Sequence, residues 1–165
     1  MNDINENSSI CDNCNNIVKS DDDFCPECGA LFIDEISCDN HKDILAEGVC
    51  IICTLPYCQK CGTIINHHFL CNYHSNYEIY EGMVRVYGTL DDVAVQYAKN
   101  CLEQVGLHPV LFCRDQPKGG PRFVYSLFEA AGDSLGHIVN EIKLMVPTQE
   151  VIKTEEILKS LKILK

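Results

Sequence analysis

Cysteine and histidine residues recur in closely spaced pairs through the first half of this 165-residue chain. Two residues separate the members of a pair, a spacing at which a tight turn points two ligand atoms at one metal ion. The pairs are Cys11/Cys14, Cys25/Cys28, Cys38/His41, Cys50/Cys53, Cys58/Cys61 and Cys71/His74. Together they supply twelve ligands, enough for three tetrahedral sets of the kind that holds structural zinc. The spacing therefore predicts three Zn²⁺ ions per chain and no open coordination position for catalysis.

The first predicted zinc set lies within residues 11–30, in the knuckles CDNC and FCPECG. Its ligands are Cys11, Cys14, Cys25 and Cys28. Pro26 and Gly29 suit the second knuckle, since proline presets φ and glycine accepts a positive φ. A disulfide or a reactive CxxC is the alternative, although no βαβ pattern surrounds these residues. The segment resembles short bacterial and archaeal zinc ribbons, and a disordered tail is expected at residues 1–10.

A second cysteine-rich module is expected at residues 37–75. Its ligands follow the order Cys-x2-His, Cys-x2-Cys-x4-Cys-x2-Cys and Cys-x2-His. This order is similar to that of B-box-type zinc fingers, in which the first pair joins the third and the second joins the fourth. The resemblance implies one ion held by Cys38, His41, Cys58 and Cys61, and another held by Cys50, Cys53, Cys71 and His74.

The end of this module departs from the B-box pattern, which closes with two histidines soon after its sixth ligand. His67 and His68 lie at about that distance, so either is an alternative ligand in place of Cys71 or His74. We favour Cys71 and His74 because they keep the two-residue spacing. A solvated loop is the simpler interpretation of the other two histidines.

The residues after position 80 predict a small α+β domain at residues 81–165. Strands are expected at 83–87, 108–113 and 138–146. Between the first two strands, a helix should begin at an N-cap Thr89 and end at Gly106. A last helix should follow Pro147-Thr148.

The helix after Thr89 has apolar residues at helical spacing, which predicts a buried face. Its members are Leu90, Val93, Ala94, Tyr97, Ala98, Cys101, Leu102 and Val105. Core packing is the expected role of Cys101 and also of Cys113. His108 and His137 have no evident catalytic partner nearby in the sequence, so no catalytic residue is assigned.

The strand and helix order of this domain favours a ferredoxin-like sheet with two helices on one face. The segment VRVYGTLDDVAVQYAKNCLEQVGL and the closing Val146-Pro147 also resemble a family of putative prokaryotic signal-transducing proteins related to PII proteins. That resemblance implies a signalling or regulatory role without naming a ligand. The apolar segment at 121–136 is an addition to the pattern of that family. We favour core packing over self-association as the role of this segment.

Acidic residues outnumber basic ones by 24 to 13 in the chain. The first 80 residues hold 13 acidic and 3 basic side chains, with no arginine. Nucleic-acid modules need Lys and Arg to displace counterions, so a nucleic-acid partner is unlikely and a protein partner is expected. No apolar run is long enough to cross a membrane, and Met1–Ile10 lacks secretory-signal character, which favours a cytoplasmic protein.

These features favour a non-enzymatic zinc-binding adaptor or regulatory protein that acts through protein–protein contacts, with homo-oligomerisation through the C-terminal domain as an option. The ribbon motivates an alternative, a transcription-related or RNA-associated zinc protein. A third class is enzymatic, either ubiquitin-ligase-like by analogy with cross-braced zinc modules or thiol-redox if the cysteines form disulfides.

Overall fold

The computed structural model describes residues 8–113 and 141–164. The chain divides into two compact units, Met1–Tyr77 and Glu78–Lys165. The apolar segment at 121–136, together with His137, lies outside the described residues, as does most of the tail expected at 1–10.

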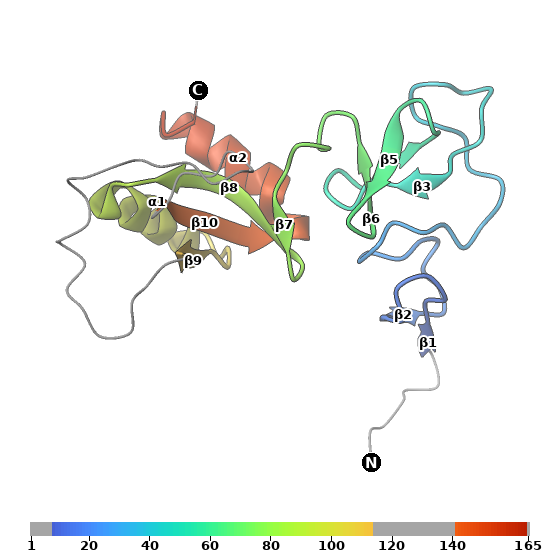
Figure 1. Ribbon diagram of the computed structural model, residues 1–165, viewed down its shortest axis with the longest axis horizontal. Coiled ribbons are helices and arrows are strands. Elements are labelled where there is room, and N and C mark those ends of the chain that lie inside the picture. Colours follow the sequence, from blue (N-terminus) through green and yellow to red (C-terminus); the bar gives the residue numbers. More distant parts are fainter. Residues whose placement is uncertain (1–7, 114–140, 165) are drawn as a thin grey trace, which may run out of the picture. The chain divides into compact units, whose positions relative to one another are not determined.

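The first unit contains three small antiparallel hairpins, each of two short strands (Figure 1). They pair β1 (Ser8–Ile10) with β2 (Ile17–Lys19), β3 (Gly48–Val49) with β4 (Pro56–Tyr57), and β5 (Gly62–Ile65) with β6 (His68–Cys71). Because β1 pairs with β2, Ser8–Ile10 belongs to the ribbon, and the prediction of a disordered tail through residue 10 is wrong for these three residues. With strands this short, the buried interior consists largely of cysteines, joined by a few residues such as Val49, Phe69 and Leu70.

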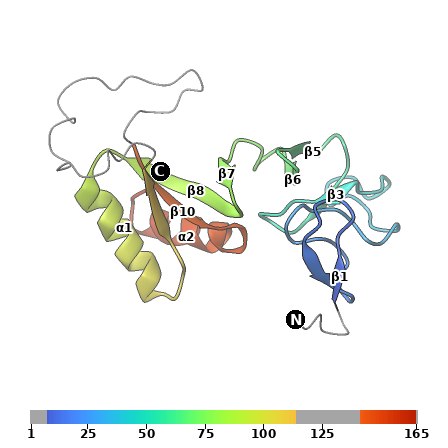
Figure 2. The same ribbon diagram turned by 60° about the horizontal axis from the view of Figure 1, so that its bottom comes forward.

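In residues 78–113 and 141–164, the second unit forms a four-stranded antiparallel sheet with two α-helices (Figures 1 and 2). Its elements are β7 (Ile79–Tyr80), β8 (Met83–Thr89), α1 (Asp92–Gln104), β9 (Val110–Cys113), β10 (Ile142–Pro147), a 3₁₀ turn η1 (Thr148–Glu150) and α2 (Val151–Ser160). The strand order is β7-β8-β10-β9. Both helices contact β8 and β10 and each other, so they cover the same face of the sheet.

The three strands predicted after position 80 are present, although their ends differ. β9 begins at Val110 rather than at residue 108, and the described part of the last strand is Ile142–Pro147. The sequence pattern did not indicate β7, which pairs through Ile79 and Tyr80 with the start of β8. This short strand gives the sheet its fourth member.

Helix α1 begins two residues later than predicted, because Asp91 and not Thr89 is the N-cap. The Asp91 carboxylate accepts hydrogen bonds from the backbone N–H groups of Val93 (2.8 Å) and Ala94 (3.1 Å). Thr89 Oγ1 instead accepts from the N–H of Asp91 itself, at 3.1 Å. The expected end at Gly106 is confirmed, and its φ of 80° is the left-handed conformation typical of a C-terminal glycine.

The face of α1 that packs on the sheet agrees only in part with the predicted one, which includes Ala98 and Leu102 but not Val95. Val95, Ala98 and Leu102 are the buried residues, at i, i+3 and i+7. Val93 is 79% exposed and Tyr97 54% exposed, although both belong to the predicted stripe. The helix carries two adjacent apolar stripes, and spacing alone does not identify the one that meets the sheet.

A charge network lies on the sheet face opposite the helices. Lys143, only 5% exposed, donates to both carboxylate oxygens of Glu78 at 2.6 and 2.8 Å. Arg85 is paired with Glu141. A register shift in the β8–β10 pairing allows Arg85 and Gly88 to share this face, and a Cβ at Gly88 would lie 2.1 Å from a Glu141 oxygen. The two positive charges of Lys143 and Arg85 are therefore balanced by the two negative charges of Glu78 and Glu141.

Candidate metal centres

Three of the predicted CxxC pairs form the same backbone turn. In each, the residue after the second cysteine has a positive φ and donates its N–H to the carbonyl of the first cysteine at 2.8 Å. These residues are Asn15 (φ 60°), Gly29 (φ 79°) and Thr54 (φ 56°). The positive φ predicted for Gly29 is confirmed. Asn15 and Thr54 adopt a positive φ as well, although they are not glycine. The turn brings both sulfurs of a pair to one side.

The first cluster brings together the four ribbon cysteines. Cys11 Sγ lies 3.8 Å from Cys28 Sγ, and Cys14 Sγ lies 3.5 Å from Cys25 Sγ. Cys11, Cys25 and Cys28 are buried, and Cys14 is half-buried. Asn16 Nδ2 approaches Cys14 Sγ at 3.6 Å and offers that sulfur a hydrogen bond.

The second cluster joins the first and third pairs of the second module. Its members are Cys38, His41, Cys58 and Cys61. Nδ1 of His41 lies 3.7 Å from Cys38 Sγ, 3.6 Å from Cys58 Sγ and 3.3 Å from Cys61 Sγ. The three cysteines are buried and the histidine is exposed. Asn40 Nδ2 donates to Cys61 Sγ at 3.4 Å.

The third cluster joins the second and fourth pairs. Its members are Cys50, Cys53, Cys71 and His74. Nδ1 of His74 lies 3.4 Å from Cys50 Sγ and 3.2 Å from Cys71 Sγ. Cys53 Sγ donates a hydrogen bond to Tyr57 Oη at 3.8 Å. Each cluster therefore has one sulfur that is hydrogen-bonded to a neutral side chain outside the ligand set.

These distances fit zinc. With Zn–S near 2.3 Å and Zn–N near 2.05 Å, a tetrahedral site separates two sulfurs by about 3.8 Å and a sulfur and a nitrogen by about 3.5 Å. The ligand atoms of each cluster lie within 4.8 Å of one another. The sulfurs are much too far apart for the roughly 2.05 Å of a disulfide, and all twelve cysteines are free. Three clusters of this composition are consistent with three zinc sites per chain.

The two alternative histidines lie outside the clusters. His67 has a φ of 67° and, with Asn66 (φ 48°), makes the two-residue turn between β5 and β6. His68 Nδ1 lies 2.8 Å from the carbonyl oxygen of Glu27, in the ribbon. The structure instead brings Cys71 and His74 together with the Cys50 pair.

The protein environment shifts the thiol pKa values in opposite directions. Burial raises the pKa of Cys38, but hydrogen bonds from backbone N–H groups and from the His41 side chain outweigh it, so the pKa falls to about 6. A hydrogen bond from the Cys53 side chain is the main cause that lowers the pKa of Cys50 to about 4. Burial raises the pKa of Cys25 to about 12. The surroundings therefore favour the thiolate at Cys38 and Cys50 and disfavour it at Cys25, and any ligand thiol that is still protonated loses its proton when metal binds.

The ribbon and the second module are joined by their backbones. Phe69 N–H donates to the carbonyl of Cys28 at 2.9 Å, and Val49 N–H donates to that of Gly29 at 2.8 Å. Val49 directly precedes Cys50, and Phe69 lies two residues before Cys71. The second knuckle of the first cluster is therefore hydrogen-bonded to β3, which directly precedes Cys50, and to β6, which contains Cys71.

The side-chain hydrogen-bond partners of the sulfurs were not identified from the sequence. Asn16 and Asn40 lie within two residues of a ligand, but so do several other polar residues. Tyr57 lies four residues after Cys53 and is buried. Such hydrogen-bond partners orient the ligands and tune thiolate basicity, and only the folded backbone shows which side chains reach a sulfur.

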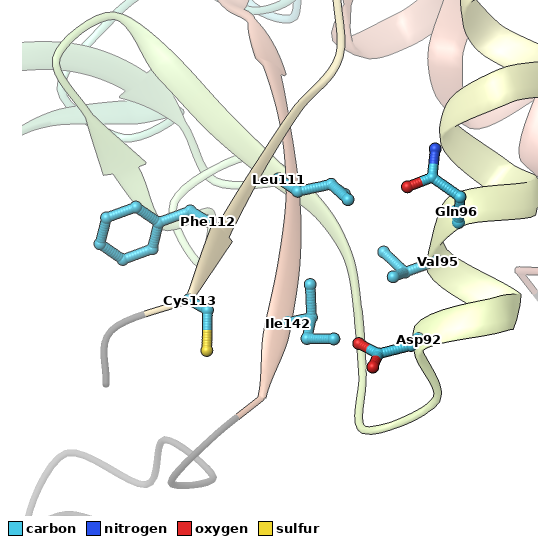
Figure 3. A pocket seen from close by; sticks show the side chains of 7 residues that line it. All are labelled: Asp92, Val95, Gln96, Leu111, Phe112, Cys113 and Ile142. Atoms are coloured by element: carbon cyan, nitrogen blue, oxygen red, sulfur yellow. The ribbon is translucent and has the colours of Figure 1, made fainter. Parts of the chain in front are cut away.

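A separate pocket of about 290 Å³ lies in the second unit, between α1 and strands β9 and β10. Figure 3 shows that Val95, Leu111 and Ile142 form its apolar side, whereas Phe112 points away from α1. Asp92, Gln96 and Cys113 complete the described lining, which holds neither a histidine nor a cationic side chain.

Among the described residues, no helix combines the length and apolar character needed to cross a membrane. Comparisons of the chain with protein-family models, with curated proteins and with solved structures find no match.

Proposed function

We propose that this chain is a non-enzymatic zinc-binding adaptor or regulatory protein, whose zinc-rich unit binds another protein and whose α+β unit has a signalling role. The observation that carries the proposal is the closure of the three metal clusters. Each already has four protein ligands, and at least two members of every cluster are buried. A catalytic zinc keeps a position for water or substrate, whereas a structural zinc does not.

Charge supports a protein as the partner. The first 80 residues carry only Lys19, Lys42 and Lys60 as basic side chains, against 13 acidic ones. Zinc with four thiolates adds a further negative charge to the ribbon, since four anionic ligands exceed the two charges of the ion. Phosphate backbones would be repelled by this unit, but a protein surface with basic side chains would not.

The arrangement of the ligands supports a more specific assignment of the second module. Its pairs alternate between two clusters, as they do in B-box-type zinc fingers. In the second unit, the order β7-β8-β10-β9 with two helices on one face is compatible with a ferredoxin-like arrangement. We infer that this unit is related in function to the putative prokaryotic signal-transducing proteins that its sequence resembles. Exposed Val110 and Phe112 on its other face favour self-association there.

Two measurements test the proposal in order. Native mass spectrometry of the chain, prepared without a metal-affinity tag, should find about three zinc ions. Chemical crosslinking in the source cells should then identify a protein partner, and the purified partner should bind the zinc-loaded chain. Removing zinc with a chelator should abolish that binding.

The proposal fails if one zinc or none is bound and the thiols are oxidised, since a redox role would then be favoured. It also fails if a purified partner binds equally well after chelation. Turnover of a substrate that one non-ligand substitution abolishes would replace an adaptor with an enzyme.

A further inference from the structure

We propose that a groove on the zinc ribbon is the docking site for a partner segment in which basic side chains alternate with apolar ones. This inference rests on the proposed function, because it names the surface through which the adaptor would bind its partner. The groove has a volume of about 510 Å³, within the range of pockets that hold ligands. It lies between the β1–β2 hairpin and residues 30–32.

The floor of the groove is continuous with the metal site. Val18, 4% exposed, packs with Cys11 in the small core of the ribbon, and both residues line the groove. Because a bound ion would hold Cys11, the floor would be as rigid as the zinc site itself. A rigid floor lowers the ordering cost that binding must offset.

Apolar side chains remain open at the rim. Ile10 is 64% exposed on β1, and Phe32 is 42% exposed on the opposite side of the groove. An aromatic residue beside a groove is the type of group that anchors protein–protein contacts. These two side chains can take up apolar residues of an occupant.

The charge of the groove favours basic side chains in the bound segment. Asp12 and Asp22 line it, and Lys19 is the one basic residue among its described lining. The zinc–thiolate group below would add a net charge of −2 through four thiolates and one Zn²⁺. Lysine or arginine side chains of an occupant would therefore find carboxylates next to an apolar rim, where partial desolvation strengthens the attraction.

The same charges argue against two other occupants. A second copy of this unit would bring together two strongly acidic surfaces, since residues 1–80 hold 13 acidic and 3 basic side chains. A nucleic acid would place its phosphates against Asp12 and Asp22. Like charges at an interface cost free energy and slow association.

The test uses the full zinc-loaded chain and a displayed library of random peptides. Selected peptides should be rich in lysine or arginine next to leucine or aromatic residues. Their affinity, measured by fluorescence anisotropy, should fall by more than about fivefold in Asp22→Asn and in Phe32→Ser, which corresponds to roughly 1 kcal/mol of binding free energy. Added salt should weaken binding to the unaltered chain. Asn at position 22 still offers an oxygen to the Lys19 N–H, which Asp22 accepts at 2.9 Å.

Matched controls change one aspartate and one aromatic residue elsewhere in the unit. Asp43→Asn and Tyr73→Ser alter exposed side chains outside the groove and should leave peptide affinity unchanged. Native mass spectrometry of all four variants should show unchanged zinc content, which separates loss of the groove from loss of the fold.

Three results would overturn the docking site: no selected peptides, acidic peptides, or peptides whose affinity the control variants reduce as much as the groove variants do. Selection of RNA from a random pool at physiological salt would replace the peptide with a nucleic acid. If the partner found by crosslinking binds the groove variants normally, the groove is not the docking site, but the adaptor function still stands. If no partner is found but the selected peptides depend on the groove residues, the groove binds peptides and the adaptor function fails.

Discussion

Gly29 and Val49 form a close backbone contact between the ribbon and the second zinc module. The N–H of Val49 donates to the carbonyl of Gly29 at 2.8 Å, and a Cβ at position 29 would lie only 2.1 Å from Val49 O. Gly29 directly follows Cys28 and Val49 directly precedes Cys50, so this contact joins ligand-bearing segments of two different clusters. The first and third metal sites should therefore be coupled in stability.

Gly29→Ala should weaken both of these sites. The substitution introduces a Cβ at a φ of 79° and pushes it against Val49 O, so it cannot be accommodated without separating the two segments. Transfer of zinc to a chromogenic chelator should become faster for two of the three ions, as counted by native mass spectrometry during the reaction.

Gly106→Ala is the matched control, because Gly106 has a φ of 80° and nothing within 4 Å of its missing Cβ. It should cost only the conformational strain, about 1–2 kcal/mol of the second unit's stability, and leave zinc transfer unchanged. Faster release of one ion alone from Gly29→Ala would show that the two clusters are independent.

Zinc removal should unfold the first unit and leave the second folded. Structural zinc contributes on the order of 10–16 kcal/mol per site in small peptides, and the first unit has few large apolar residues to replace it. The three clusters all lie before residue 75. After chelation, hydrogen exchange should become fast throughout residues 8–77, while helices 92–104 and 151–160 stay protected. Loss of protection in both units would contradict this division.

The ligand sets were predictable because the chemistry of zinc fixes both the residue types and the spacing. A CxxC pair carries its own turn, so the pairs at Cys11, Cys25 and Cys50 are visible without any knowledge of the fold. The way in which pairs join is a tertiary property. Spacing alone left it open, and the interleaving came from a family resemblance.

The buried face of α1 was predicted only in part, through Ala98 and Leu102, and the partial error has a physical cause. The exposed stripe through Val93 and Tyr97 is as apolar as the buried one through Val95 and Leu102. Which stripe meets the sheet is a tertiary property, because it depends on how α1 packs against β8 and β10.

The N-cap assignment can be checked directly. Asp91→Ala removes the acceptor of two backbone N–H groups and should lower the second unit's stability by about 1 kcal/mol. Thr89→Val removes an acceptor for one N–H outside the helix and should cost less. Denaturant unfolding followed by helical circular dichroism gives both values. If Thr89→Val lowers the stability of the second unit more than Asp91→Ala does, Thr89 is the N-cap.

A contact between His108 and Glu150 should make the second unit less stable in acid. Burial raises the pKa of Glu150, but hydrogen bonds from the His108 ring (2.6 Å) and backbone N–H (2.8 Å) outweigh it, and the pKa is lowered from 4.5. A carboxylate with a lowered folded-state pKa stabilises the fold above its unfolded pKa, and this contribution is lost as the pH falls through the folded value.

Glu150→Gln tests this contribution, because glutamine cannot ionise. At pH 7 the variant should be less stable than the unaltered chain, and the difference should shrink as the pH falls below about 4.5. Unfolding free energies at several pH values provide the measurement. Glu155→Gln changes a carboxylate of α2 that is paired with Lys159 at 3.2 Å, and it serves as the control. A pH-independent difference for Glu150→Gln would assign its effect to packing.

Thr154 places a hydroxyl group in the core of the second unit. Its side chain is fully buried in α2, and its Oγ1 has no hydrogen-bond partner among the described residues. A buried hydroxyl without a partner costs about 1–3 kcal/mol of desolvation, which an isosteric methyl group avoids. Thr154→Val should therefore raise the unfolding free energy of the second unit by about 1 kcal/mol or more. Thr154→Ser, which keeps the hydroxyl and loses the methyl, should lower it by a similar amount. If the valine variant is instead the less stable of the two, the hydroxyl has a partner in the folded chain.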